Sequence, residues 1–217
     1  MAGQPVWQGD MGRNWARLHE ATDRQLAEVG EAVLGLLDAK AGERILDLGC
    51  GAGSTTLAIA EAVGPAGRVT GIDISPDLVA HVRQRADLFP QVTIIEADAA
   101  EHAFEPAAHD ALFSRHGCMF FTDAPAAFAN IRRGLRPGAR VAMSAFAPLA
   151  ENPWATVPLA AAESVLGPAP AEAQASPGPF AWAEPSVFRT ALGDAGFRAI
   201  AWEGRTASFP IGSRRSS

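Results

Sequence analysis

The sequence predicts an α/β protein with a doubly wound, mostly parallel sheet. Two observations predict it. Short apolar runs alternate with stretches of helical length, and several of these runs end in a carboxylate. Strands that alternate with helices form parallel sheets with right-handed crossovers, and such sheets bind ligands beyond the carboxyl ends of their strands. A binding site is therefore expected where the strands end.

The first predicted strand, Arg44–Leu46, leads into a carboxylate and a glycine-rich turn. Asp47 follows the strand, and Gly49, Gly51 and Gly53 follow Asp47 at alternate positions. Glycines allow a sharp turn into a helix and leave backbone N–H groups bare for a ligand. The turn therefore indicates a loop that binds a nucleotide-containing cofactor.

The spacing of this loop argues against a dinucleotide. Ser54 stands where the dinucleotide pattern GxGxxG needs its third glycine, and it begins a predicted helix, 54–63. The Asp47 carboxylate is also poorly placed for a pyrophosphate, because like charges repel, whereas it suits a cation. The alternative is an ordinary strand-to-helix turn with an Asx hydrogen bond.

The second run, Arg68–Asp73, ends in another acid about 20 residues after the last glycine, where a βαβ unit delivers a carboxylate to a ribose. A carboxylate accepts hydrogen bonds from both hydroxyls of a diol, so Asp73 is the predicted ribose ligand. A turn before the predicted helix 76–88 would also explain Asp73, although Ser75 suits the N-cap better.

Three further runs complete the predicted sheet. Val92–Ala97 precedes Asp98, His109–Ser114 precedes Arg115–Gly117 at the expected mouth of the site, and Arg140–Phe146 follows a predicted turn, 135–139. A further helix is expected at 124–135.

Together these segments resemble the class I S-adenosylmethionine-dependent methyltransferases, in particular the ubiquinone-biosynthesis-like group that acts on small molecules. The resemblance covers roughly Glu43–Phe146 and departs mildly at Ala139, where a second glycine is usual. It implies a Rossmann-like methyltransferase fold with an amino-terminal helical lid, and S-adenosylmethionine as cofactor. The implied cofactor-binding residues are Asp47, Gly49, Cys50, Gly51, Gly53, Asp73, Ile74, Asp98, Ala99 and Ser114, with Asp98 and Ala99 at the adenine.

One domain in four parts is expected. Residues 1–42 form a helical cap, with a helical pattern over 14–37, and residues 43–147 form the cofactor-binding core. Residues 148–185 are an insertion that shapes the acceptor pocket and includes a breaker-rich loop, 167–179. Residues 186–217 hold the last helix, strand six at 197–209 and a tail. Candidate pocket walls are Phe146, Trp154, Phe180 and Trp182, for which a satellite hydrophobic cluster is an equal alternative.

After Phe209 the chain leaves no room for the final antiparallel strand that closes the sheet in similar proteins. The chain is therefore expected to be carboxyl-terminally truncated, or to have its edge completed by a second copy in a homodimer. An uncovered edge also invites aggregation.

Composition limits the partners. With a net charge of −6 and a single lysine, Lys40, no nucleic-acid partner is expected. No run of about 18 apolar residues and no secretory signal is present, so a cytoplasmic location without membrane insertion is expected. Cys50 and Cys118 are too few for a metal set and are expected to be free thiols.

The predicted function is in-line methyl transfer to a small-molecule acceptor. No catalytic residue is assigned, although His116 lies at the predicted mouth and His19 lies on the lid. A non-catalytic S-adenosylmethionine-binding module is the alternative. A nicotinamide-dependent oxidoreductase is less favoured, because the third glycine is missing and the chain contains no tyrosine.

Overall fold

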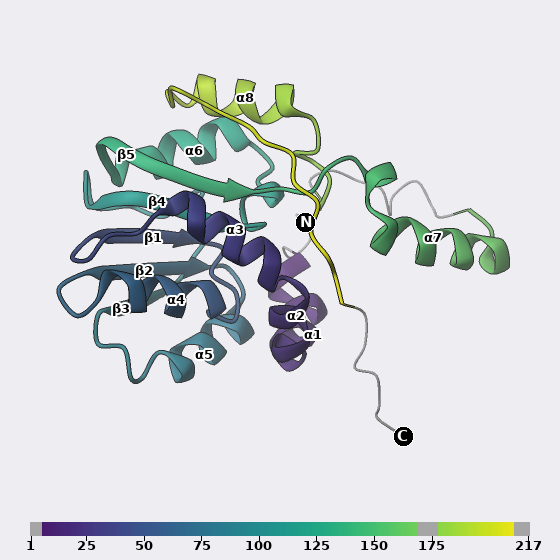
Figure 1. Cartoon of the computed structure of the whole chain (residues 1–217), viewed down its shortest axis with the longest axis horizontal. Helices are drawn as coiled ribbons and strands as arrows, with labels where there is room; N and C mark the ends of the chain where they lie inside the picture. Colours follow the sequence, from purple (N-terminus) through teal and green to yellow (C-terminus); the bar gives the residue numbers. More distant parts are fainter. Residues whose placement is uncertain (1–5, 169–177, 211–217) are drawn as a thin grey trace.

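A computed structural model describes residues 6–168 and 178–210, and its centre is a five-stranded sheet of order β3-β2-β1-β4-β5 with every pairing parallel (Figure 1). The predicted fold class is confirmed. Most of the loop predicted at 167–179 and the tail after 210 lie outside the described residues. The strands are β1 (Arg44–Leu48), β2 (Arg68–Asp73), β3 (Val92–Glu96), β4 (His109–Arg115) and β5 (Leu135–Ser144).

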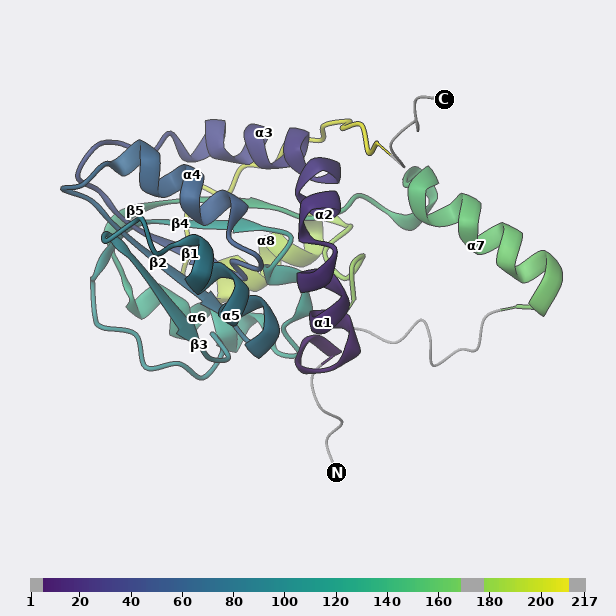
Figure 2. The same ribbon diagram turned by 90° about the horizontal axis from the view of Figure 1, so that it is seen from below.

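Helices cover both faces of the sheet, which makes it doubly wound (Figure 2). On one face lie α3 (Ala27–Leu37), α4 (Ser54–Val63) and α5 (Pro76–Arg85), and on the other lie α6 (Ala124–Arg133) and α8 (Pro185–Asp194). Each face has its own buried apolar cluster, one centred on Phe113 and the other on Phe128. The sheet is therefore held from both sides and fixes the positions of the strand ends.

The amino-terminal segment folds into separate helices where one continuous helical pattern was expected. These are the short η1 (Val6–Gln8), α1 (Asp10–Arg17), α2 (His19–Gln25) and α3, with breaks at Leu18 and Leu26. In both views α1 and α2 lie at the end of the sheet where the strands terminate (Figures 1 and 2). A Cβ on Gly12 would lie 2.3 Å from Ser75 Oγ, so α1 packs directly on the start of α5.

Strand β5 begins earlier than predicted, at Leu135, because the predicted turn is a bulge within the strand. His109 of β4 pairs with Leu135, but Ala111 pairs with Arg140, so residues 136–139 loop out opposite a single residue. Gly138 has φ +81° there. The short η2 (Cys118–Phe120) follows β4; η3 (Leu149–Glu151) and α7 (Pro153–Leu166) follow β5.

The prediction of a sixth strand at 197–209 is wrong. Residues 197–210 form no strand, and Ala199 has φ +54°, which interrupts an extended backbone. Phe197 and Ile200 pack on the α6–α8 side, whereas Trp202 is exposed, so the side chains do not alternate between two faces. The segment instead runs from α8 to the other side of the sheet, where the Ser208 N–H donates to Glu28 Oε2 of α3 at 2.8 Å (Figure 1).

Candidate functional site

The glycine loop after β1 adopts a conformation that requires its glycines. Gly49, Gly51 and Gly53 have φ of +67°, +54° and +87°. A Cβ on Gly49 would lie 2.7 Å from the Cα of Gly117, so the loop touches the segment after β4 backbone to backbone. A Cβ on Gly53 would lie 2.3 Å from Val82 Cγ2. The loop is therefore clamped between β4 and α5.

Asp47 lies in β1 with 1% of its surface exposed, and only one of its oxygens is satisfied. Oδ2 accepts from the hydroxyls of Thr55 at 3.2 Å and Thr56 at 2.7 Å, at the start of α4. Oδ1 is buried and has no hydrogen-bond partner among the described residues. Burial raises the pKa of Asp47 to about 6, although the two threonine hydroxyls and nearby Arg115 act in the opposite direction. The free oxygen is suited to a cationic or N–H-bearing ligand.

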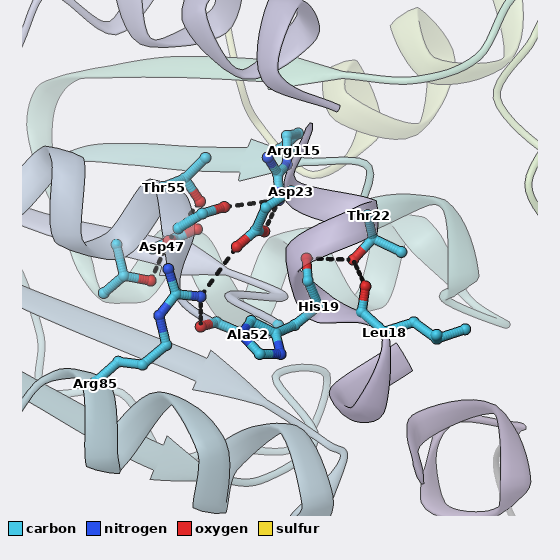
Figure 3. Close-up of polar contacts among 12 residues, drawn as sticks. Leu18, His19, Thr22, Asp23, Asp47, Ala52, Thr55, Arg85 and Arg115 are labelled. Carbon is cyan, nitrogen blue, oxygen red and sulfur yellow. Dashed lines mark hydrogen bonds and ion pairs between the residues drawn. The ribbon is translucent and has the colours of Figure 1, made fainter. Parts of the chain in front are cut away.

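Arg115, the last residue of β4, places a positive charge beside this acid. It donates to Ser54 Oγ at 3.1 Å and lies 3.8 Å from Asp23 of α2 (Figure 3). Asp23 also accepts from Arg85 of α5 at 3.1 Å, and Arg85 donates to the Ala52 carbonyl in the glycine loop at 2.6 Å. Asp23 thus links the amino-terminal helix α2 to two arginines that flank the loop.

Sequence reasoning missed this polar cluster of Asp23, Arg85 and Arg115. The three residues are far apart in the chain and resemble surface charges when read one at a time. Only Arg115 carried a signal, through its position at the end of a predicted strand. Burial lowers the pKa of Arg115, but a guanidinium remains charged in proteins. An acid with a free oxygen and a cation thus lie side by side at the loop, and this pair complements an amino-acid zwitterion.

Asp73 ends β2 next to the loop. Its Oδ2 accepts from the Gly51 N–H at 2.8 Å and its Oδ1 from the Ser75 N–H at 2.9 Å. Ser75 caps α5 by accepting from the Leu78 N–H at 3.5 Å, as predicted. Burial raises the pKa of Asp73 against the effect of these backbone bonds. Each carboxylate oxygen has a second lone pair, so the turn interpretation and the ribose interpretation are compatible.

The remaining predicted residues lie along the same edge. Asp98 follows β3 and accepts from the Ala100 N–H at 2.8 Å, while Ala99 is buried beside it. Ser114 is fully buried and donates to the Leu48 carbonyl at 2.8 Å, so its hydroxyl ties β4 to β1. Cys50 and Cys118 are buried free thiols, as predicted, and burial raises the pKa of both.

The two histidines considered from the sequence have different surroundings. His116 stacks on Phe146 with ring centroids 4.1 Å apart, and His19 of the lid lies 4.0 Å from His81. Of the four predicted pocket walls, Phe146, Trp154 and Phe180 cluster together. Trp182 does not join them, because it packs in the core against Phe128 and Phe188.

Residues 45–138 match the family described as "Methyltransferase domain". With the doubly wound sheet and the glycine loop in place, this stretch is a class I S-adenosylmethionine-dependent methyltransferase domain. The resemblance inferred from the sequence is therefore confirmed, and S-adenosylmethionine is the cofactor of this class.

Two methyltransferases of known name are similar to this chain in sequence. The chain is 33% identical over 150 residues to nocamycin O-methyltransferase of Saccharothrix syringae. The aligned region covers 66% of this chain and 53% of that protein. It is 37% identical over 111 residues to 2-phytyl-1,4-naphtoquinone methyltransferase of Trichormus variabilis. Here the aligned region covers 50% of this chain and 48% of that protein. The chain thus spans about half the length of these two relatives.

Solved structures agree on the fold. The complex between the Haloferax volcanii Trm112 methyltransferase activator and a putative methyltransferase contains a chain that matches with a TM-score of 0.71 at 22% identity, over 94% of this chain and 81% of that chain. None of the helices in the described part of the chain combines the length and the apolar composition that a membrane span requires.

Proposed function

We propose that this protein transfers a methyl group from S-adenosylmethionine to a small-molecule acceptor. The observation that carries the proposal is the unpartnered Oδ1 of buried Asp47 beside the Arg115 guanidinium at the glycine loop. A buried carboxylate oxygen without a hydrogen bond is costly, so a ligand that brings an ammonium or N–H group to it is favoured. The α-ammonium and α-carboxylate of S-adenosylmethionine supply both complementary charges.

The rest of the cofactor would lie along the strand ends. We assign the ribose to Asp73 and Ile74, which adjoin the glycine loop through the bond between Asp73 and the Gly51 N–H. We assign the adenine to Asp98 and Ala99 after the neighbouring strand β3. The contribution proposed for Ser114 is indirect, because its hydroxyl already binds Leu48.

S-adenosylmethionine, when bound, supplies a methyl group on a good leaving group. The chain's own contribution is to orient the reactants and exclude water. The lid helices α1 and α2 would provide the exclusion, since α1 packs on Ser75 and α2 reaches Arg115 through Asp23. No general base is assigned.

The names of the relatives support small acceptors, namely a naphthoquinone and nocamycin. A cytoplasmic location, the absence of a nucleic-acid partner and a homodimer stay predictions. The non-catalytic S-adenosylmethionine-binding module is the alternative that the transfer assay below separates from the enzyme.

Two measurements test the proposal. Calorimetry should detect binding of S-adenosylmethionine and no binding of NADH. Transfer of a labelled methyl group to components of a metabolite extract should then identify the acceptor. Binding without any transfer would favour the non-catalytic module, and binding of NADH alone would overturn the proposal.

Replacing Asp73 with alanine should weaken S-adenosylmethionine and S-adenosylhomocysteine equally, because both carry the same ribose. Loss of charge-assisted hydrogen bonds predicts about 1 to 3 kcal/mol for each ligand. Calorimetry with both ligands checks this, and Asp110→Ala is the control, because Asp110 binds Arg44 and Arg136 near the opposite end of β4. A loss confined to one ligand would show that the ribose assignment is wrong.

The affinity for S-adenosylmethionine should fall as the pH falls through about 6, the raised pKa of Asp47. Below that pH a proton neutralises Asp47 and competes with the ligand's ammonium group, whose own pKa of about 8 keeps it charged. Calorimetry between about pH 5 and pH 7 in wild type and in Asp47→Asn measures the effect. An equally steep decrease in Asp47→Asn would assign it to another group, such as Asp73.

A further inference from the structure

His116 has a left-handed backbone conformation directly after β4, next to the glycine loop. It is a non-glycine residue with φ +61°, and it directly follows β4. Left-handed conformations are unfavourable for side chains with a Cβ and occur often at functional sites. The next residue, Gly117, touches Gly49 of the glycine loop, so His116 lies between that loop and the segments after β5.

The two ring nitrogens of His116 are buried without hydrogen bonds. Neither Nδ1 nor Nε2 has a partner among the described residues. Burial, aided by the charge of Arg115, lowers the pKa of His116 to about 3, so the ring is neutral and offers one donor and one acceptor. Unsatisfied buried polar groups are rare in native proteins and costly. A polar ligand group that meets this ring would remove the cost.

Aromatic rings from separate segments gather around Phe146, the ring on which the imidazole stacks. We call His116, Phe146, Trp154, Phe180 and Phe209 the aromatic box. Phe146 is parallel to His116 within 8°, and its ring centroid lies 5.0 Å from Trp154, 5.9 Å from Phe180 and 6.2 Å from Phe209. The chain thus gathers flat apolar surface next to the imidazole that carries two unsatisfied nitrogens.

Two members of the aromatic box are weakly anchored. Phe180 and Phe209 lie in segments without helix or strand. The segment of Phe209 is the one that does not form the expected sixth strand and is held through the Ser208 bond to Glu28. A flat ligand can therefore enter by displacing these two rings, whereas Trp154 lies in the first turn of α7 and Phe146, two residues after β5, packs against both His116 and Trp154.

We propose that His116 determines acceptor specificity by hydrogen-bonding the hydroxyl group of a flat aromatic acceptor held in the aromatic box. This inference rests on the proposed function and names the acceptor class for it. The imidazole nitrogens bond in the plane of the ring, so the hydroxyl lies edge-on to His116, while the acceptor ring stacks among Phe146 and Trp154.

Calorimetry on the full chain saturated with S-adenosylhomocysteine tests the inference with two probes. 1-Naphthol carries the hydroxyl, and 1-methoxynaphthalene has the same rings without the O–H donor. Wild type should prefer 1-naphthol by about fivefold or more. His116→Phe keeps a ring and removes both nitrogens, so it should abolish the preference and still bind both probes. Phe146→Ala should weaken both probes equally.

His81→Phe is the matched control, because His81 also has an unpartnered Nε2 but lies against His19 of the lid. It should keep the preference of wild type. If His116→Phe does not fold, imidazole ¹⁵N spectra of wild type replace it: the His116 signals should shift with 1-naphthol and shift much less with 1-methoxynaphthalene.

Failure of the inference is distinguishable from failure of the proposed function. A protein that binds S-adenosylhomocysteine but shows no binding of 1-naphthol, or the same preference in His116→Phe as in wild type, overturns the inference alone. A protein that does not bind S-adenosylhomocysteine overturns the proposed function first.

Discussion

Replacing Asp47 with alanine should weaken S-adenosylmethionine binding by about 1 to 3 kcal/mol, which corresponds to roughly 5- to 150-fold in Kd. The substitution removes the free Oδ1 that is proposed to meet the α-ammonium group, and it leaves Asp23 as the acid beside Arg115. Calorimetry on the folded variant measures the loss.

A ligand lacking the amino-acid end provides the control. 5′-Methylthioadenosine keeps the adenine and the ribose hydroxyls and lacks the α-ammonium and α-carboxylate, with a neutral thioether in place of the sulfonium. Asp47→Ala should therefore leave its affinity unchanged, whereas Asp73→Ala should weaken it. The Asp47 carboxylate also accepts from Thr55 and Thr56, so thermal unfolding must confirm that α4 is intact. A folded Asp47→Ala variant with unchanged affinity for S-adenosylmethionine would contradict the assignment of the glycine loop.

Gly49→Ala should destabilise the protein by about 2 to 5 kcal/mol. A left-handed backbone costs roughly 1 to 2 kcal/mol for a residue with a Cβ, and an added methyl group in a packed site costs roughly 1 to 3 kcal/mol more. The neighbour at 2.7 Å is the Cα of Gly117, which is backbone and cannot rotate away. The loop and the segment after β4 would have to separate.

Gly51→Ala is the matched variant, because Gly51 also has positive φ but a Cβ there meets nothing within 4 Å. It should incur only the backbone cost of about 1 to 2 kcal/mol. Denaturant unfolding of both variants gives the comparison. Equal free energies of unfolding would mean that Gly49 and Gly117 are not in tight contact in solution.

The sheet could be predicted from the sequence because its signals are local. Each of the first four strands is a short apolar run with a clear end. Asp47 precedes the glycine turn, Asp73 follows from the spacing of a βαβ unit, and Asp98 was implied by the resemblance. Even the N-cap at Ser75 is a local signal, because it precedes a proline at the first helical position.

What escaped prediction depends on contacts between distant segments. Asp23 meets Arg85 and Arg115 only after the lid has docked on the folded core. The prediction of a sixth strand was wrong because it relied on a local signal alone. Phe197 and Ile200 gave an apolar signal that packing on α8 and α6 satisfies without strand pairing. Such a signal cannot distinguish a strand from an extended chain that lies across a hydrophobic cluster.

Contacts of α2 also couple the amino-terminal helices to the glycine loop. Asp23 bridges two arginines, one of which also holds the Ala52 carbonyl, so the position of α2 is coupled to the shape of the glycine loop. Binding at the loop and closure of the lid are therefore expected to influence each other.

The glycine loop and the neighbouring strand ends are proposed to hold S-adenosylmethionine, and a crystal structure of the full chain with S-adenosylhomocysteine is the decisive test. We expect the amino-acid end between Asp47 and Arg115, the ribose hydroxyls on Asp73 and the adenine beside Asp98 and Ala99. Ligand bound elsewhere, with the Asp47 Oδ1 still unpartnered, would contradict this assignment.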